Sequence, residues 1–372
     1  MNTSPFQSSI EQVIDHLPAV RHIHEFAPDH TVDCIVAISG FEKRCISAAH
    51  AMIERGWVTS SSICVTYGDP GMKTPNERHL ASLCTALTEL GNGNPPRLIE
   101  HNDHNVEVDF GQSLLKEISD LGVAVGLCTS HIVFDITVGS SRLLLEGLHA
   151  LLKTNARLTL IYTEAGLYRP RFDEYVSLVA QGRVRQIDAP EFLTQGVDRV
   201  EIVNSIQGMC VDSRPAFLVV FPAFAFTRIS AVIDEIAPSR VQWIYGIPHL
   251  VENRWRIDAQ REYHATLVEG SHRHCYVSTF DYRETLLVLE RIYQKRREDY
   301  GIFVASLGSK LQKVGQALFH TLRPEAAAVV AIPHLWSDDR YSEELPRSTF
   351  VVPLGDCGSL RDALWRCRRL RL

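Results

Sequence analysis

Short apolar runs alternate with longer amphipathic segments along most of this chain. Nearly continuous apolar runs are typical of strands that are buried on both faces of a parallel sheet. The predicted strands span residues 32–38, 62–67, 97–100, 132–136, 158–162, 217–221, 241–245, 275–278, 302–305 and 328–332. The segments between them have the apolar spacing of helices. This alternation predicts an α/β fold with mostly parallel sheets.

One strand-to-helix turn occurs twice in the chain. Residues 135–142 read DITVGSSR and residues 304–310 read VASLGSK, so in both copies an apolar strand ends in a Gly-Ser pair that opens a helix. Two further matches precede the turn in the same order, Arg44 with Arg228 and Tyr67-Gly68 with Tyr245-Gly246. A repeated order of signatures indicates an internal duplication.

The repeat predicts two tandem Rossmann-like domains, at residues 1–168 and 215–372. Residues 169–214 match nothing in the other half and are predicted to form a connecting segment. A chain of 372 residues is long enough to bury two separate cores. The expected fold class is therefore α/β, with two internally duplicated domains.

The composition is that of an ordinary globular protein, with 45% hydrophobic and 22% charged residues. A net charge of −6 excludes a global basic field for a nucleic-acid backbone, although a local groove stays open. No stretch has the length of a membrane span or the pattern of a signal peptide. The nine cysteines are spread without a C-x-x-C motif, as is typical of a cytoplasmic protein with reduced thiols.

The repeated turn is also the strongest candidate site. A Gly-Ser pair at a helix N-terminus exposes backbone N–H groups and a hydroxyl where the helix dipole is positive, which suits a phosphate. The same residue types are ordinary helix caps, so both interpretations stay open. In an open α/β sheet, ligands bind outside the carboxyl ends of the strands, and the loops that follow neighbouring strands should line the same crevice.

Side chains in these loops complete the predicted ligand-binding set. A glycine lets the backbone approach a ligand, an aromatic ring could stack on a base, and a cation could reach a phosphate. The alternative is a set of turn residues with exposed charges in the first helical turn. The predicted set is Gly40, Phe41, Arg44, Tyr67, Gly139, Ser140, Ser141, Arg142, Arg228, Gly246, Gly308, Ser309 and Lys310.

The sequence contains no motif of metal or cofactor chemistry. It has no Walker A motif, no G-x-G-x-x-G and no G-x-S-x-G elbow. His101, Asp103 and His104 follow a predicted strand but lack the spacing of a metal-ligating pair. We expect no cofactor and no metal, and we assign no catalytic residue.

The first turn resembles the signature of the CARF (CRISPR-associated Rossmann fold) superfamily, a D-x-T-G-G-T-K-like turn between a central strand and a helix. The residues that stand at matching positions are Asp135, Thr137, Gly139 and Ser140. The resemblance covers the turn together with the helix and strand that follow it.

Both copies depart from the signature. In the first, Val138 replaces a glycine, Ser141 replaces the lysine, and Arg142 lies one place late. The second copy lacks the Asp and the Thr, but its residues 308–310 match the end of the pattern.

The resemblance implies a sensor of nucleotide second messengers, typically cyclic oligoadenylates, whose pocket forms between two copies of the domain. Such copies usually meet in a homodimer, and here the duplication could supply both within one chain. Sensors of this superfamily usually carry an effector domain, and two domains use nearly all of this chain. The resemblance therefore implies a regulatory subunit of a prokaryotic antiviral defence system, acting on a separate effector protein.

Two other functions stay open at this stage. One is an enzyme that cleaves its bound nucleotide without a metal, or processes a nucleoside, with Ser140, Ser141 and Lys310 as the groups to suspect. The other is a scaffold subunit that binds only proteins.

Overall fold

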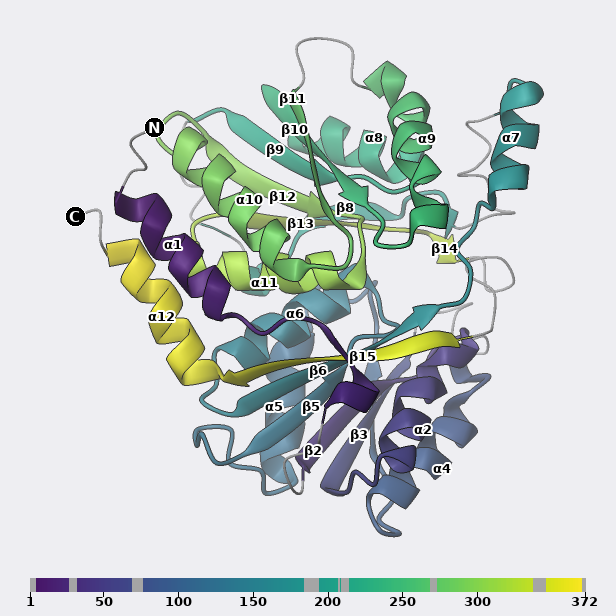
Figure 1. Cartoon of the computed structure of the whole chain (residues 1–372), viewed down its shortest axis with the longest axis vertical. Helices are drawn as coiled ribbons and strands as arrows, with labels where there is room; N and C mark the ends of the chain where they lie inside the picture. Colours follow the sequence, from purple (N-terminus) through teal and green to yellow (C-terminus); the bar gives the residue numbers. More distant parts are fainter. Residues whose placement is uncertain are drawn as a thin grey trace. The chain divides into compact units, whose positions relative to one another are not determined.

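The computed structural model describes residues 5–26, 32–68, 76–183, 194–206, 208, 214–267, 273–336 and 346–369. The chain forms two compact units. The first unit comprises Met1–Leu167 together with Ser342–Leu372, and the second comprises Tyr168–Tyr341. Both units are drawn in Figure 1, where colour follows the sequence.

A seven-stranded sheet forms the centre of the first unit. Its strands lie in the order β1 (Arg21–His22), β15 (Pro346–Asp356), β6 (Arg157–Ala165), β5 (His131–Asp135), β2 (Val32–Ile38), β3 (Thr59–Tyr67) and β4 (Arg97–His101). The five strands from β6 to β4 pair in parallel, and β15 pairs antiparallel with both β6 and β1.

The second unit is built on a six-stranded sheet. Its order is β11 (Arg273–Ser278), β10 (Arg240–Ile247), β9 (Ala216–Phe221), β12 (Gly301–Ser306), β13 (Ala327–Ile332) and β8 (Arg199–Ile202). The first five pair in parallel and β8 pairs antiparallel with β13. A separate two-stranded ribbon joins β7 (Thr194–Gln195) to β14 (Leu335–Trp336).

Helices cover both faces of each sheet (Figure 1). Those of the first unit are α1 (Pro5–His16), α2 (Ser47–Glu54), α4 (Leu80–Leu90), α5 (Phe110–Asp120), α6 (Ser141–Leu152) and α12 (Cys357–Arg369). Those of the second are α7 (Phe172–Ala180), α8 (Phe226–Ile236), α9 (Trp255–Tyr263), α10 (Tyr282–Arg296) and α11 (Lys310–Leu322). Within the first unit, α2 and α4 lie on one face of the sheet and α5 and α6 on the other (Figure 1).

The predicted α/β class is confirmed. Every residue of β5 and of β13 is buried, as continuous apolar runs predict for the centre of a parallel sheet. Taken in chain order, the five parallel strands of each unit lie side by side as third, second, first, fourth, fifth. This is the strand order of a Rossmann half, and both sheets have it. No helix in the described part of the chain is long and apolar enough to span a membrane.

The observed units differ from the predicted division at the C-terminal end. Residues 342–372 belong to the first unit, because β15 pairs along its length with β6. Residues 169–214, predicted to connect two domains, fall within the second unit and include α7 and β8. The second unit is thus an insertion between two neighbouring strands of the first sheet. Pairing between residues that lie so far apart leaves no local pattern in the sequence.

Truncation after residue 341 tests this division. We expect hydrogen-exchange protection to be lost in β6 and β5, because β6 would become an uncovered edge. Protection in β9 and β12 should persist, since the strands around them remain. Truncation after residue 369 is the matched control, and it should leave both sheets protected. Loss of protection mainly in the second unit would contradict the division.

Candidate functional site

The two Gly-Ser turns occupy equivalent places in the two sheets. One follows β5 and the other follows β12, and each of these strands lies next to the first parallel strand of its sheet. The strand order reverses at that place, so the carboxyl edge opens there into the crevice where α/β proteins bind ligands. Each unit therefore has one such switch point, and we refer to the residues around these two points as the first and the second crevice.

The first turn has the backbone that a glycine provides. Gly139 has a φ of +118°, a backbone conformation in which any residue with a side chain would be strained. A Cβ added there would also lie only 2.9 Å from the Ile38 side chain. Ser140 caps α6, since its Oγ accepts from the Leu143 amide at 3.1 Å. The Ser140 amide donates to the hydroxyl of Tyr67 at 2.7 Å. Tyr67 is thus a hydrogen-bond partner of the turn, at the end of β3.

A carboxylate of the protein itself lies at this helix N-terminus. Asp103 Oδ1 accepts from Ser140 Oγ at 2.7 Å and lies 2.9 Å from His101 Nε2. Burial alone would raise the pKa of Asp103, but the charge and hydrogen bond of His101, the hydrogen bond of Ser140 and the charge of Arg142 outweigh burial and lower it. Asp103 therefore stays ionised and supplies the negative charge that the helix dipole favours.

Arg142 is engaged in the interior of the first unit. Its Nε donates to Glu146 Oε1 at 3.1 Å, and its Nη atoms donate to the carbonyls of Asp103 and Val108 at 2.8 and 3.0 Å. The other oxygen of Glu146 accepts from the amide of Phe110 at 2.9 Å. Both charged side chains are buried, at 2% and 1% exposure. This arrangement ties α6 to the segment that leads into α5.

Arg44 is engaged in a similar way. It donates to both oxygens of Glu42, at 3.2 and 2.9 Å, and to the carbonyl of Thr163 at 3.1 Å. Gly40 lies close against Val138, and Phe41 is half-buried beside it in the same loop. Ser141, the first residue of α6, is also half-buried. Each predicted phosphate-reaching arginine of the first crevice is thus bound to a carboxylate of its own.

Asp135, at the end of β5, is buried without full compensation. Its Oδ1 accepts from the Thr137 amide at 2.9 Å, and its Oδ2 has no hydrogen-bond partner among the described residues. Burial raises the pKa of Asp135 to about 6, against the opposing effects of Thr137 and Arg44. The carboxylate at the centre of the sheet edge is therefore held at a cost in stability.

The second turn is organised by Gln312 rather than by a carboxylate. Ser309 caps α11, accepting from the Gln312 amide at 3.1 Å, while Gln312 Oε1 accepts from the Ser309 amide at 2.9 Å in a capping box. Ser309 Oγ also donates to the Thr279 carbonyl at 2.5 Å. An added Cβ at Gly308 would overlap Gln312, and one at Gly246 would overlap Thr279. Both glycines thus allow a close approach between the turn and the ends of β10 and β11.

Three basic side chains gather at this second turn. Lys313, one turn into α11, is only 3% exposed, and its Nζ donates to the Gly308 carbonyl at 3.0 Å. The pKa of Lys313 is lowered well below its usual value by burial and by the positive charges of Lys310 and Arg228. Lys310 is half-buried at the first position of the helix, and Arg228 is buried on α8.

The positions equivalent to the acids of the first crevice hold neutral residues in the second. Glu42 precedes Arg44 by two positions, and Phe226 precedes Arg228 by two. Six positions after the capping serine stands Glu146 in α6, whereas Gly315 has this place in α11. Tyr67 pairs with His101, and Asp103 follows two residues later. In the second unit Tyr245 pairs with Tyr276, and the residue two positions later is the neutral Ser278.

Tyr67 and Tyr245, predicted to match, lie on equivalent strands, β3 and β10, but have different surroundings. Tyr245 is buried among Trp243, His274 and Tyr276, with ring centroids 6.2 to 6.4 Å apart. The second unit has another aromatic pair beside its turn. The rings of His249 and Phe280 lie 4.3 Å apart, and Phe280 directly follows the Thr279 that accepts from Ser309.

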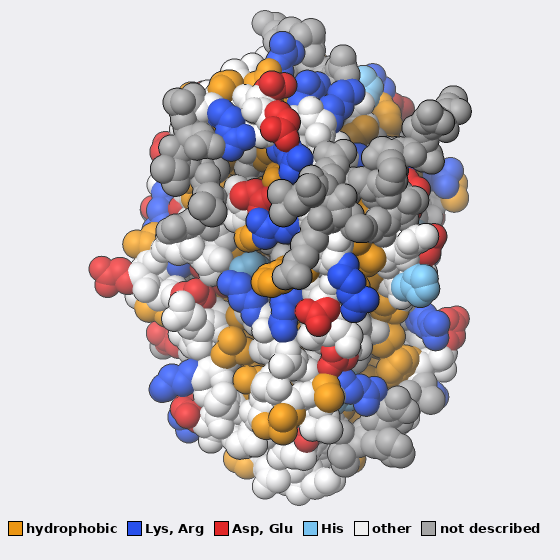
Figure 2. Space-filling view, turned by 90° about the vertical axis from the view of Figure 1, so that its left-hand side faces the viewer, with side chains coloured by type: hydrophobic (Ala, Val, Ile, Leu, Met, Phe, Trp, Pro, Cys, Tyr) orange, Lys and Arg blue, Asp and Glu red, His pale blue; other side chains and the backbone are white. Residues whose placement is uncertain are grey.

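Other clusters in the described residues have less to offer a ligand. A Ser, a His and an Asp meet in the first crevice, but the acid stands in the middle, so the imidazole does not contact the serine hydroxyl. Among the described residues, no three or more His, Cys, Asp or Glu side chains are grouped to hold a metal ion. On the face shown in Figure 2, the described basic and acidic side chains are interspersed.

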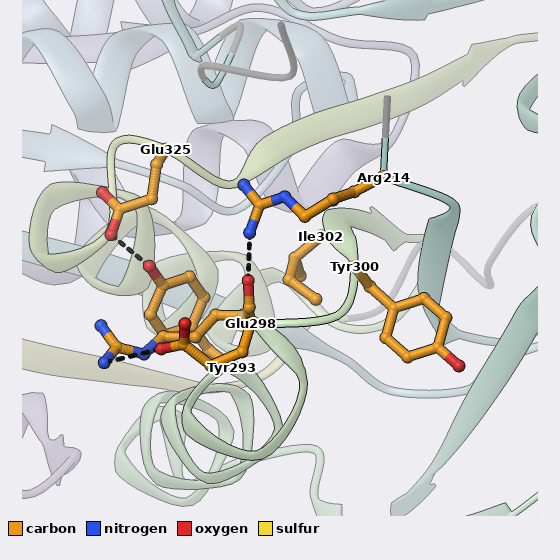
Figure 3. Close-up of a pocket in the computed structure, with 8 residues that line it drawn as sticks. Arg214, Tyr293, Glu298, Tyr300, Ile302 and Glu325 are labelled. Atoms are coloured by element: carbon orange, nitrogen blue, oxygen red, sulfur yellow. Dashed lines mark hydrogen bonds and ion pairs between the residues drawn. The ribbon is translucent and has the colours of Figure 1, made fainter. Parts of the chain in front are cut away.

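A cavity of about 180 Å³ lies at the opposite edge of the second sheet, where β12 begins (Figure 3). Tyr293 donates to Glu325, Arg297 pairs with Glu298 at 3.1 Å, and Arg214 donates to the carbonyl of Arg297. Two arginines thus face two glutamates, and the cavity has no excess of positive charge. It lies away from the Gly-Ser turn of its own unit.

Sequence reasoning missed Lys313 and Asp103 as determinants of the two crevices. Lys313 stands three positions after Lys310, a spacing that places both side chains on one helix face, so the signal was present. Asp103 gave no comparable signal, because it reaches Ser140 only through the pairing of β3 with β4.

In comparisons of sequence, no family model and no curated protein matches this chain. Among solved structures, it is similar to a type III CRISPR defence DNA nuclease activated by cyclic oligoadenylate, with a TM-score of 0.48 and 8% identity. The match covers 81% of this chain and 65% of that one, so the chain spans less than two thirds of the nuclease's length.

Two further solved structures are more distant. The cytoplasmic domain of a prokaryotic cation chloride cotransporter matches with a TM-score of 0.23 and 6% identity, over 84% of this chain and 98% of that one. A putative universal stress protein from Pseudomonas aeruginosa UCBPP-PA14 matches with a TM-score of 0.23 and 11% identity, over 90% and 98%. Likenesses this remote transfer no activity to the chain.

Arg142→Ala tests whether Arg142 serves the fold. We expect a loss of about 3–5 kcal/mol in the free energy of unfolding, because the substitution leaves Glu146 charged and buried without its partner. The double variant Arg142→Met, Glu146→Leu should lose much less, since it removes both charges. Urea unfolding of the three proteins measures the effect. An Arg142→Ala variant as stable as the wild type would mean that the arginine is not needed for folding.

Asp135→Asn tests the buried carboxylate. The pKa of Asp135 is raised from 3.8 to about 6 in the folded protein, so the unfolded chain releases its proton first as the pH rises. As the pH rises from about 4 to about 6, the free energy of unfolding of the wild type should therefore fall relative to that of the variant, by up to roughly 3 kcal/mol. Thermal unfolding of both proteins across that range measures the difference. A difference that does not change with pH would show that Asp135 is not perturbed.

Proposed function

We propose that this protein binds an anionic nucleotide at the carboxyl edge of the second sheet, around the first turn of α11. The gathering of Lys313, Lys310 and Arg228 at that turn carries the proposal. A buried cation among other cations is unfavourable, and a bound anion would relieve the repulsion. The N-terminus of α11 adds its own positive potential at the same place.

The surroundings favour a nucleotide over a bare anion. Phe280 and His249 follow β11 and β10 at the same edge, and their ring centroids lie 4.3 Å apart with the planes tilted by 32°. Phe280 is the residue next to Thr279, which accepts a hydrogen bond from Ser309 of the turn. A phosphate on α11 would thus have an aromatic surface nearby for a base, and stacking of this kind does not depend on the base.

We propose a different role for the first crevice. Asp103, Glu42 and Glu146 already supply negative charge to the turn and to its two arginines. The equal strand order of the two sheets and the shared order of their signatures support a duplication. After it, the first copy would have acquired its own carboxylates, while the second kept its cations for a ligand.

The proposed nucleotide serves as a signal rather than as a substrate. In the first crevice Asp103 lies between the imidazole of His101 and the hydroxyl of Ser140, which argues against serine chemistry there. The CARF-like resemblance favours a cyclic oligoadenylate as the ligand and a prokaryotic antiviral defence system as the setting. We accordingly propose a regulatory subunit, in which the bound second unit acts on a separate effector protein.

Binding measurements with Lys310→Ala and Lys313→Met test the proposal. We expect a panel of cyclic tri-, tetra- and hexa-adenylates, linear oligoadenylates and ATP to include a ligand that raises the melting temperature of the wild type. Each variant should weaken that binding at least about tenfold, as the loss of a charged contact to phosphate does. Chromatography of the recovered ligand shows whether it stays intact.

Lys295→Met is the matched control, because Lys295 is an exposed lysine of α10 in the same unit. It should bind like the wild type. The proposal fails if no member of the panel binds, or if both turn variants bind as tightly as the control. A ligand that is bound and then cleaved would identify an enzyme instead.

A further inference from the structure

Lys313 is placed unlike most lysines of folded proteins. Its side chain is buried at 3% exposure, and its Nζ donates to the Gly308 carbonyl at 3.0 Å. Lysine carries a strongly hydrated charge, which is costly to remove from water without an opposite charge beside it. One carbonyl oxygen offers a neutral amine a sufficient partner but does not compensate a buried ammonium.

Among the described residues, the two charged groups that shift the pKa of Lys313 are both positive. Lys310 lies on the same helix, one turn earlier, and Arg228 lies on α8. Together with burial, these two charges lower the pKa of Lys313 well below the ordinary value for lysine. The side chain has the environment of a lysine that is uncharged in the absence of a ligand.

We propose that Lys313 takes up a proton when an anion binds at the first turn of α11, so that the affinity of this site increases as the pH falls. The inference rests on the proposed anion site and adds a regulatory property to it. No covalent step is involved: the amine of Lys313 accepts one proton from solvent and becomes an ammonium. The anion supplies the opposite charge that the ammonium lacks in the empty site.

The direction of the effect follows from the linkage between protons and ligand. If binding takes up one proton, affinity rises by about tenfold for each unit by which the pH falls. This holds between the low pKa of Lys313 in the empty site and its higher pKa in the complex.

Sulfate is the probe that isolates the protein's own proton. It remains a dianion at neutral pH, so a change of affinity with pH cannot come from the ligand. We expect the dissociation constant of sulfate, measured by calorimetry at constant ionic strength from about pH 6 to about pH 9, to fall toward low pH in the wild type. In Lys313→Met the affinity should be lower and independent of pH.

Two controls separate this inference from the proposed site itself. Lys295→Met should keep the affinity and pH dependence of the wild type, and Lys310→Ala should bind more weakly but still with a pH dependence. Sulfate binding that depends on Lys310 without changing with pH would overturn the proton uptake and leave the site intact. No sulfate binding at any pH would overturn both.

Nitrogen-15 NMR of the lysine side chains provides an independent readout. The Nζ signal of Lys313, assigned by its absence in Lys313→Met, should have the shift of a neutral amine in the empty protein at neutral pH. Saturating sulfate should move it to the shift of an ammonium. A signal that is already that of an ammonium before sulfate is added would overturn the inference.

Discussion

The charge at the first turn of a helix, where the backbone dipole is positive, governs both crevices of this protein. In the first unit a carboxylate of the protein balances the positive end of the helix dipole, because Asp103 accepts a hydrogen bond from the capping Ser140 and stays ionised. The second unit places two basic side chains, Lys313 and Lys310, at the same point, where burial and nearby positive charge lower the pKa of Lys313. Helices that begin with the same serine cap thus have a carboxylate at the first turn in one unit and basic side chains there in the other.

The fold could be derived from the sequence because its signals are local. Continuous apolar runs predicted the ten parallel strands, and β2 was predicted with the bounds that it has. The C-terminal division could not be derived in this way. β15 pairs with β6 through residues such as Val351 and Ile161. The sequence around each of these residues contains no pattern that identifies its pairing partner. Strand pairing over such separations depends on the whole fold, not on a pattern.

The candidate site shows the same limit. The Gly-Ser turns and the cations near them were readable, but a cation in the sequence does not reveal whether a carboxylate meets it in the fold. Arg142 and Lys310 looked equivalent, although Arg142 has Glu146 one turn later on its helix. The difference could have been read from helical spacing in that instance. For Ser140 it could not, because Asp103 arrives from a different strand.

The insertion of the second unit has a consequence for how the protein could be rebuilt. Ala165, at the end of β6, is the pairing partner of Pro346, at the start of β15. The chain therefore leaves the first sheet and returns to it at adjacent points, in the manner of a hairpin whose loop has grown into a whole unit. A short turn between Ala165 and Pro346 would therefore connect β6 to β15 as an ordinary β-hairpin and leave the first sheet without the second unit.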